Sequence, residues 1–240
     1  FSQFIGAEMM AEKYDLSKEE LDAFSLASHQ KAMQATNEGQ FANEIVALEK
    51  RDLDGLPTGE QCTIDEGIRF DASLEGIAGV KLLQQDGRIS AASASQICDG
   101  ATGVMIVNEN GLKKLGVEPI ARIHHMTMIG HDPVIMLEAL IPATEAALKK
   151  AGMSIDDIDL FEVNEAFASV PLAWLKETGA DPERLNVNGG AIALGHPLGV
   201  SGTKLMTTLV HALKNRNKRY GLQTMCEGGG MANVTIVERL

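Results

Sequence analysis

Three short clusters in the second half of the chain combine reactive side chains with glycine-rich backbone. The longest runs from 188 to 202 and places one histidine, His196, among five glycines, just before a helix expected from about 201. Glycine lets the backbone approach a ligand closely, a helix start offers free N–H groups, and histidine can act as a base near neutral pH. The cluster indicates a site, with a structural turn and an incidental histidine as the alternative. It is not a P-loop, because no Gly-Lys-Ser/Thr sequence ends it.

The other two clusters place polar groups at predicted strand ends. Asn164 lies where an apolar strand runs into a predicted helix, in Val-Asn-Glu-Ala-Phe-Ala. This position suits a site, although a helix cap is the simpler interpretation of Asn164 taken alone. Cys226 is followed by Glu and three glycines, 228–230. That pattern predicts a thiol at the mouth of a hairpin loop whose N–H groups could form an oxyanion hole, with a buried inert cysteine as an equal alternative.

The remaining histidines and cysteines suggest less. His124, His125 and His131 match no common metal-ligand spacing, so we expect no metal site. Cys62 and Cys98 have no obvious base nearby in sequence. Three widely spaced cysteines argue against a disulfide framework and for a reducing compartment.

The elements that must hold these clusters are those of a layered α/β domain from about residue 117 to the end. Ser17 and Glu20 have capping-box spacing, which predicts a helix over 17–38. Residues 50–80 are turn-rich, and a loop of that length tends to be functional. The other predicted elements are a buried strand at 104–107, helices at 141–152, 164–177 and 201–214, a strand at 160–163, and a hairpin of strands near 221–226 and 231–238.

Composition excludes several classes of protein. The 240 residues are 45% hydrophobic and 22% charged, which is ordinary for a globular protein, and the net charge of −12 argues against nucleic-acid and membrane-surface partners. No apolar run approaches the roughly 18 residues that span a bilayer. No signal peptide and no peroxisomal Ser-Lys-Leu tail are visible, so we expect a cytoplasmic protein, most simply in a bacterial cytosol.

In this order and spacing, Asn164-Glu-Ala-Phe, Gly195-His-Pro and Cys226-x-Gly-Gly-Gly resemble the thiolase family. The segments 4–12, 65–69 and 94–101 fit the same family, so the resemblance runs nearly from end to end. It implies an α/β, thiolase-like layered fold, with a mixed sheet covered by helices and the N-terminal domain largely absent. We expect a loop domain over 1–97, a remnant of the N-terminal domain over 98–118, and the C-terminal domain over 119–240.

The resemblance implies an acyl-CoA C-acyltransferase that cleaves a 3-ketoacyl-CoA with CoA, or runs the reverse condensation. Thiolases carry their nucleophilic cysteine upstream of this segment, so no cysteine here is assigned that role, and activity should require the missing part. By the same resemblance, His196 activates the nucleophile and Cys226 moves the α-carbon proton. Asn164 holds a water that stabilises the enolate with His196, and the Gly228 N–H donates to the tetrahedral oxyanion.

The family also implies a site for coenzyme A, as co-substrate rather than permanent cofactor. Ser95 would contact the pantetheine arm and Arg69 the nucleotide end. The residues expected to line the tunnel near the thioester are Ala91, Met136, Ala166 and Phe167. Cys98 and Leu83 depart from common family residues, and Leu83 together with the His-Pro-Leu sequence at 196–198 favours acyl chains longer than acetoacetyl, including bulky ones.

The expected partners are acyl-CoA and CoA, further copies of the chain in a dimer or tetramer, and a separate N-terminal fragment. Without such a fragment, the strands near 98–118 should be distorted or disordered, because their edges and apolar face would be exposed. Two alternatives stay open: a non-catalytic CoA-binding protein, and a ketoacyl-synthase-type condensing enzyme. Cys226 disfavours the second, because such enzymes have a histidine or asparagine at that position.

Overall fold

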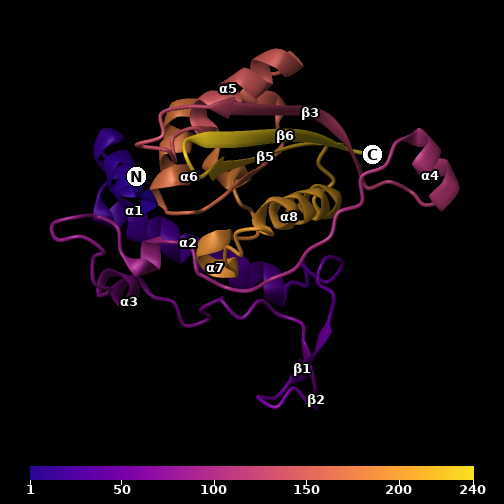
Figure 1. Ribbon diagram of the computed structural model, residues 1–240, viewed down its shortest axis with the longest axis horizontal. Coiled ribbons are helices and arrows are strands. Elements are labelled where there is room, and N and C mark those ends of the chain that lie inside the picture. Colours follow the sequence, from indigo (N-terminus) through magenta and orange to yellow (C-terminus); the bar gives the residue numbers. More distant parts are fainter.

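The computed structural model describes residues 1–240, and its centre is a four-stranded mixed sheet (Figure 1). The strand order is β3-β6-β5-β4, in which β3 pairs with β6 and β6 with β5 antiparallel, while β5 and β4 run parallel. The strands are β3 (Ala121–Gly130), β4 (Leu160–Val163), β5 (Tyr220–Glu227) and β6 (Met231–Arg239). The predicted strand at 160–163 and the predicted C-terminal hairpin are confirmed.

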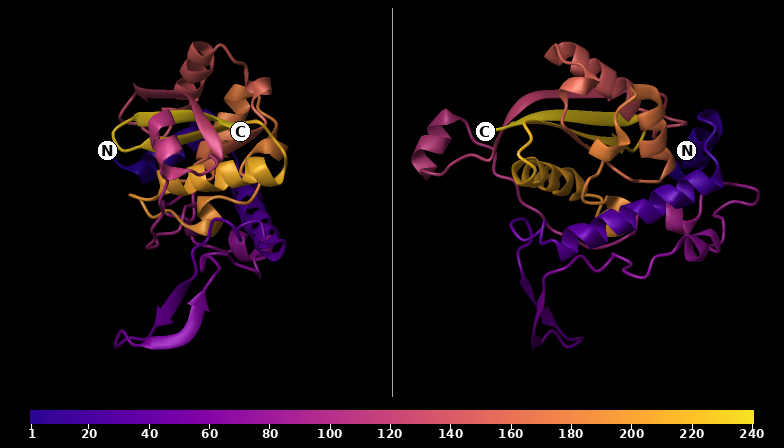
Figure 2. Two further views of the ribbon diagram at one scale, coloured as in Figure 1. Left: turned by 90° about the vertical axis from the view of Figure 1, so that its right-hand side faces the viewer. Right: turned by 180° about the vertical axis from the view of Figure 1, so that it is seen from behind.

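Helices cover both faces of this sheet, as expected. On one face lie α5 (Leu140–Ala151) and α6 (Ser169–Thr178), whose Trp174 packs edge-on against Phe161 of β4 in the largest core cluster. On the other face lies α8 (Ser201–Asn215), where Leu209 and Leu213 pack with Leu160 in a second cluster. Figure 2 shows the same layering from two further directions.

Two N-terminal helices support the sheet and the loops at its edge. Helix α1 (Gln3–Lys13) packs against α6, and α2 (Lys18–Asn37) packs against the short helix α7 (Ala191–Leu194). The capping box predicted at the start of α2 is present, since the side chains of Ser17 and Glu20 each accept a hydrogen bond from the other residue's backbone N–H. None of the helices is both long and apolar enough to cross a membrane.

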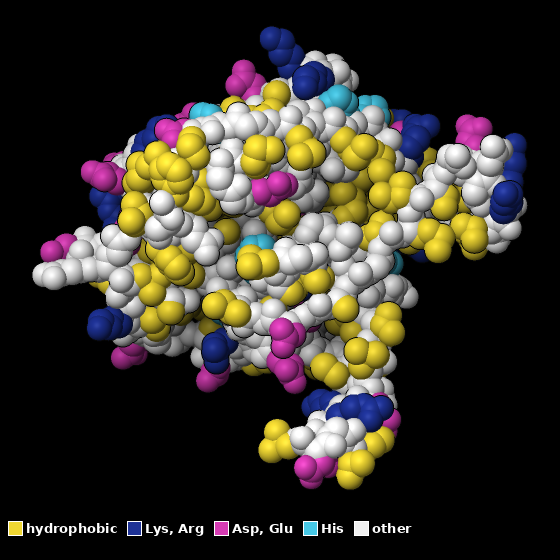
Figure 3. Space-filling model, in the orientation of Figure 1, with side chains coloured by type: hydrophobic (Ala, Val, Ile, Leu, Met, Phe, Trp, Pro, Cys, Tyr) yellow, Lys and Arg dark blue, Asp and Glu magenta, His cyan; other side chains and the backbone are white.

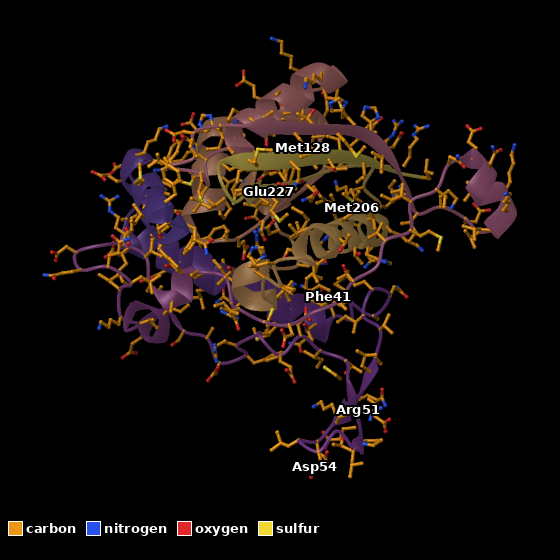
Figure 4. All side chains as sticks on the ribbon, viewed as in Figure 1. Phe41, Arg51, Asp54, Met128, Met206 and Glu227 are labelled. Atoms are coloured by element: carbon orange, nitrogen blue, oxygen red, sulfur yellow. The ribbon has the colours of Figure 1, made fainter.

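Between α2 and β3 the chain is mostly irregular, as the turn-rich composition predicted. A two-stranded hairpin, β1 (Leu48–Arg51) and β2 (Pro57–Cys62), projects from the body with both strands almost fully exposed. Arg51 and Asp54 mark this hairpin in Figure 4. The remaining short elements are α3 (Leu74–Ala78), η1 (Ala91–Ser93), α4 (Glu109–Leu115), η2 (Ile155–Asp157) and η3 (Pro182–Arg184).

Two predicted elements are wrong. Residues 104–107 form no strand, because no neighbouring strand pairs with them, and Met105 and Ile106 are 75% and 71% exposed. Figure 3 shows hydrophobic side chains gathered along this segment where it leads to α4. The helix predicted over 164–177 begins only at Ser169, because the backbone of 164–168 is hydrogen-bonded to the segment around Ser93 and Ser95 instead of to a helical turn. The Ala168 N–H, for example, donates to the Ser93 carbonyl at 2.8 Å.

The division into segments 1–97, 98–118 and 119–240 stays a prediction. Side chains from both outer segments share the largest core cluster, in which Met10 and Ile89 pack with Phe161 and Val163. The segment between them is mostly exposed and ends in the projecting helix α4.

Candidate active site

The motifs that contain Asn164 and Cys226 meet at one edge of the sheet. The Asn164 N–H donates to the Thr224 carbonyl at 3.1 Å, which continues the parallel pairing of β4 and β5 by one residue. Cys226 lies two residues further along β5. Because parallel strands end at the same edge of a sheet, Asn164 and Cys226 lie close to each other there. Asn164 is not a helix cap, since α6 begins at Ser169 with no side-chain cap.

The glycine-rich motif brings His196 to the same edge. Asn164 Nδ2 lies 3.4 Å from His196 Nε2, and His196 Nδ1 lies 2.5 Å from Ser201 Oγ. The Ser201 hydroxyl also lies 3.1 Å from the Pro197 carbonyl, which can only accept. A hydroxyl has a single proton, so Ser201 donates it to Pro197 and accepts from His196 Nδ1–H. The ring therefore carries its proton on Nδ1, and the lone pair on Nε2 faces Asn164.

Burial adjusts the pKa of the two titratable groups in opposite directions. Removal from water lowers the pKa of His196, because burial disfavours the imidazolium, and the ring is therefore neutral at neutral pH. Burial raises the pKa of the Cys226 thiol to about 12, and the charge of Glu227 adds to the rise. At neutral pH the site thus presents one base, His196, and one protonated acid, Cys226.

The loop after Cys226 contains three glycines that differ in what the fold requires of them. Gly229 and Gly230 both have a φ of +81°, and a Cβ on Gly230 would lie 2.7 Å from the Asp132 carbonyl oxygen. Gly228 has neither constraint, because a Cβ there would meet nothing within 4 Å. Its N–H donates to no acceptor in the protein. Figure 4 labels Glu227, which leads into this loop at the end of the β5–β6 hairpin.

A buried carboxylate holds the glycine-rich loop against Asn164. Glu165 accepts hydrogen bonds from Ser28 Oγ at 2.6 Å, Asn186 Nδ2 at 2.9 Å and the Ile192 N–H at 3.1 Å. A Cβ on Gly190 would lie 2.2 Å from the Glu165 carboxyl carbon, so only glycine fits there. Burial raises the pKa of Glu165, although these hydrogen bonds oppose the rise. The Asn-Glu-Ala-Phe motif contains Glu165, but this supporting role is not visible in the sequence, because Ser28, Asn186 and Ile192 lie far from Glu165 along the chain.

A small cavity of about 10 Å³, large enough for one water molecule, lies between the glycine-rich loop, β4 and α8. Glu162, Asn164 and Ser201 are among its lining residues. Glu162 is 1% exposed, and burial, reinforced by the charges of Glu165 and Glu44, raises its pKa well above the ordinary value. The cavity behind the site is therefore polar, and its buried Glu162 could not be recognised from the sequence because Glu162 looks like an ordinary strand residue.

Most of the residues expected to bind coenzyme A lie together beside this edge. The Ser95 N–H donates to the Ala166 carbonyl at 3.0 Å, and the bridge between Ala94 and Phe167 fixes the next pair. Met136 belongs to the same core cluster as Ala166 and Phe167 and has the unusual φ of +28°. Ala91 begins η1, whose Ser93 carbonyl holds the Ala168 N–H, and Ala91 itself is exposed.

Arg69 lies on the neighbouring loop with its side chain exposed. The Arg69 N–H donates to Nδ1 of buried His29 at 3.2 Å, so this loop is fixed to α2. Burial, followed by the charge of Arg69, lowers the pKa of His29, which keeps that nitrogen free to accept. Sequence reasoning missed His29, because a histidine within an amphipathic helix gives no signal of a loop partner.

The other reactive residues lie outside the site or at its border. His124 stacks edge-on against Tyr220, His125 bonds to Thr127, and His131 faces Glu138, so the three do not converge. No group of three or more His, Cys, Asp or Glu side chains could hold a metal ion. Cys98 is exposed and packs against Gly195, where an added Cβ would lie 2.3 Å from its Sγ, whereas Cys62 lies on the projecting hairpin.

Comparison with known proteins shows both the family and the fold. A model of the thiolase C-terminal domain matches residues 117–239, and a model of the thiolase N-terminal domain matches residues 3–110. The second match does not support the expectation that the N-terminal domain is largely absent. Two solved structures superpose closely. Human mitochondrial 3-ketoacyl-CoA thiolase, 39% identical, has a TM-score of 0.93 over 98% of this chain and 59% of its own. The acetyl-CoA acetyltransferase of Bacillus anthracis, 35% identical, has a TM-score of 0.92 over 99% and 60%.

Curated relatives agree over the whole of this chain but are longer. The steroid 3-ketoacyl-CoA thiolase of Mycobacterium tuberculosis is 53% identical over 239 residues, which are 100% of this chain and 57% of that protein. The 3-ketoacyl-CoA thiolase of Photorhabdus laumondii is 44% identical over 98% of this chain and 61% of its own. This chain thus spans about three fifths of the length of these relatives. The matches to both domain models, together with these identities, show that the chain belongs to the thiolase family.

Proposed function

We propose that this chain carries the proton-transfer and oxyanion-binding groups of an acyl-CoA C-acyltransferase. The reaction is cleavage of a 3-ketoacyl-CoA by CoA to acetyl-CoA and a shortened acyl-CoA, or the reverse condensation. The observation that carries the proposal is the meeting of His196, Asn164 and Cys226 at one sheet edge, beside the unpaired N–H of Gly228. The nucleophilic cysteine is expected outside this segment, and neither Cys62 nor Cys98 is assigned that role.

The protonation states of these residues suit the cleavage direction. His196, neutral and with an unprotonated Nε2, accepts the proton of the attacking thiol, because a thiolate is the effective nucleophile. The thiolate adds to the keto carbon, and the new oxyanion accepts a hydrogen bond from the Gly228 N–H. The bond between the α-carbon and the keto carbon then breaks, and its electron pair forms the enolate of acetyl-CoA. Cys226, a protonated thiol, donates its proton to that α-carbon.

The same geometry gives the enolate oxygen its donors. Once His196 has taken a proton, Nε2–H can donate toward the enolate, and a water held by Asn164 would supply a second hydrogen bond. Ser201 keeps Nδ1–H engaged throughout, so the ring cannot present the wrong nitrogen. In the condensation direction the roles reverse, and Cys226 must lose its proton first. The high pKa of Cys226 makes that direction the more demanding one at neutral pH.

The proposed substrates are coenzyme A thioesters. Ser95 would contact the pantetheine arm and Arg69 the nucleotide end, while Ala91, Met136, Ala166 and Phe167 would line the reacting end. The human mitochondrial thiolase, similar to this chain over 58% of its length, has been solved with CoA. The 53% identity to a steroid 3-ketoacyl-CoA thiolase supports a bulky acyl group. We also propose that the protein assembles into dimers or tetramers and that it is cytosolic.

The direct test is intact mass of the purified protein under denaturing conditions, followed by thiolysis of acetoacetyl-CoA and of a longer 3-ketoacyl-CoA. We expect thiolysis in any preparation that also contains the nucleophilic cysteine, with loss of at least about 100-fold on His196→Ala. Thiolysis that proceeds unchanged without His196 would contradict the proposal. A protein that binds CoA but leaves α-protons and thioesters untouched would be a non-catalytic CoA-binding member of the family.

A further inference from the structure

One side chain ties together the segments that carry the CoA-binding and catalytic residues. The amide nitrogen of Gln96 lies 2.7 Å from the Gly67 carbonyl and 2.7 Å from the Ile192 carbonyl. An amide has two N–H donors, so each carbonyl receives one. Gly67 belongs to the loop that carries Arg69, and Ile192 belongs to α7, which leads directly to His196.

The backbone of Gln96 makes a second set of contacts with the segment from Ala191 to His196. The His196 N–H donates to the Gln96 carbonyl at 2.9 Å, and the Gln96 N–H lies 3.4 Å from the Ala191 carbonyl. Its neighbour Ser95 is the residue expected to contact the pantetheine arm. One residue thus holds the Arg69 loop with its side chain and the His196 backbone with its carbonyl.

The packing around this contact leaves little freedom. A Cβ on Gly67 would lie 2.7 Å from the Ala193 carbonyl oxygen and 3.0 Å from Gln96 Oε1, so the loop is pressed against both α7 and the amide. Gln96 is half-buried, and both of its N–H groups are used. A carboxylate at this position would place acceptors against two acceptors, and an apolar side chain would leave both carbonyls without this donor.

We propose that Gln96 is a positioning residue that sets the CoA-binding loop at 65–69 relative to His196, an inference that rests on the proposed function. The reacting carbon of a CoA thioester bound through Arg69 and Ser95 would thereby lie close to His196. Loss of the Gln96 amide would loosen binding and chemistry together, because one contact serves both segments.

The test compares Gln96→Glu, which exchanges the donor for acceptors, with Gln96→Met, which keeps the volume and removes the donors. Gln61→Glu is the matched control, because Gln61 lies exposed on β2. CoA affinity is measured by calorimetry, and α-proton exchange of acetyl-CoA at saturation is measured in D₂O. Both Gln96 variants should weaken CoA binding about tenfold or more and slow saturated exchange by a similar factor. The Gln61→Glu control should keep the wild-type affinity and rate.

Amide hydrogen exchange followed by mass spectrometry makes the coupling visible independently of activity. We expect faster exchange in peptides over 65–69 and over 191–196 together in both Gln96 variants. Faster exchange in only one segment, or weaker CoA binding with an unchanged saturated rate, would overturn the proposal. If the wild-type protein neither binds CoA nor exchanges α-protons, the proposed function fails, while the two amide-exchange peptides still decide the role of Gln96.

Discussion

His196 Nδ1 lies 2.5 Å from Ser201 Oγ, and this contact decides which ring nitrogen is available for chemistry. The Ser201 proton goes to the Pro197 carbonyl, so the ring proton stays on Nδ1 and Nε2 faces Asn164 with its lone pair. His196 Nε2 is therefore available as a base at the sheet edge where Cys226 and Gly228 lie.

Ser201→Ala should slow the α-proton exchange of acetyl-CoA by about 10- to 100-fold, because the His196 ring loses the partner that fixes its tautomer and orientation. Ser201→Thr keeps a hydroxyl at the same place and should retain most of the rate. The measurement is saturated exchange as a function of pH, together with CoA affinity, which should barely change in either variant. An alanine variant as fast as the threonine variant would show that Ser201 has no orienting role.

Gly228→Ala and Gly230→Ala should separate catalysis from folding. A Cβ at Gly228 meets nothing in the protein, so stability should be unchanged, whereas activity should fall by about 100-fold or more because the added methyl group would crowd the N–H proposed to bind the oxyanion. Gly230→Ala should lower the free energy of unfolding by at least about 1 kcal/mol, since φ is +81° and the Asp132 carbonyl is too close. Thermal unfolding and exchange kinetics of both variants check this. Equal loss of stability in the two would contradict it.

Cys226 should resist alkylation at neutral pH while Cys98 reacts. Burial keeps Cys226 protonated, with a pKa of about 12, whereas Cys98 is exposed at the border of the site. Iodoacetamide at pH 7.5 followed by peptide mass spectrometry should therefore label Cys98 first, by a wide margin. Bound CoA should protect Cys226 further. Preferential labelling of Cys226 would mean that its thiolate is formed in the resting protein.

Glu44 should make stability fall as pH rises through the neutral range. Burial raises its pKa from 4.5 to about 7, although the Thr208 hydroxyl donates to it at 3.0 Å. Between these two values the folded protein holds a proton that the unfolded chain has released. The free energy of unfolding therefore declines from about pH 4.5 upward, by at most about 3 kcal/mol by pH 8.

Glu44→Gln should remove this dependence, because the amide keeps the shape and cannot ionise. Chemical denaturation at pH 5 and pH 8 measures it, and the variant should lose less stability than the wild type between the two. Glu38→Gln, on the exposed C-terminal cap of α2, is the matched control. An identical pH slope for Glu44→Gln and the wild type would show that Glu44 is ionised in the folded protein.

Local patterns in the sequence predicted much of the fold. The capping box at Ser17, the apolar run at 160–163 and the hairpin around 228–230 all describe contacts between residues near one another in the chain. The predictions were wrong where the secondary structure depends on partners that are distant in the sequence. Residues 104–107 have strand composition but no strand beside them, and 164–168 has helical periodicity but bonds to the segment around Ser93 and Ser95.

The site residues, too, could be predicted from the sequence only where a local motif marks them. His196, Asn164 and Cys226 carry recognisable motifs, so sequence and family resemblance could name them, although their roles remain proposals. Ser201, Gln96 and Glu165 support those residues through hydrogen bonds that join segments far apart in the chain, such as Ser28 with Glu165. No spacing in the sequence predicts such contacts, because a single polar residue on a helix or loop is common and does not indicate its partner.

The most direct test of the central claim is α-proton exchange of acetyl-CoA in D₂O by this chain, because proton transfer at the α-carbon needs Cys226 and the oxyanion donors but no nucleophilic cysteine. We predict exchange above the uncatalysed rate, increasing with pH as Cys226 ionises, and at least about 100-fold slower in Cys226→Ala. CoA binding without any exchange, or exchange that Cys226→Ala leaves unchanged, would contradict the account.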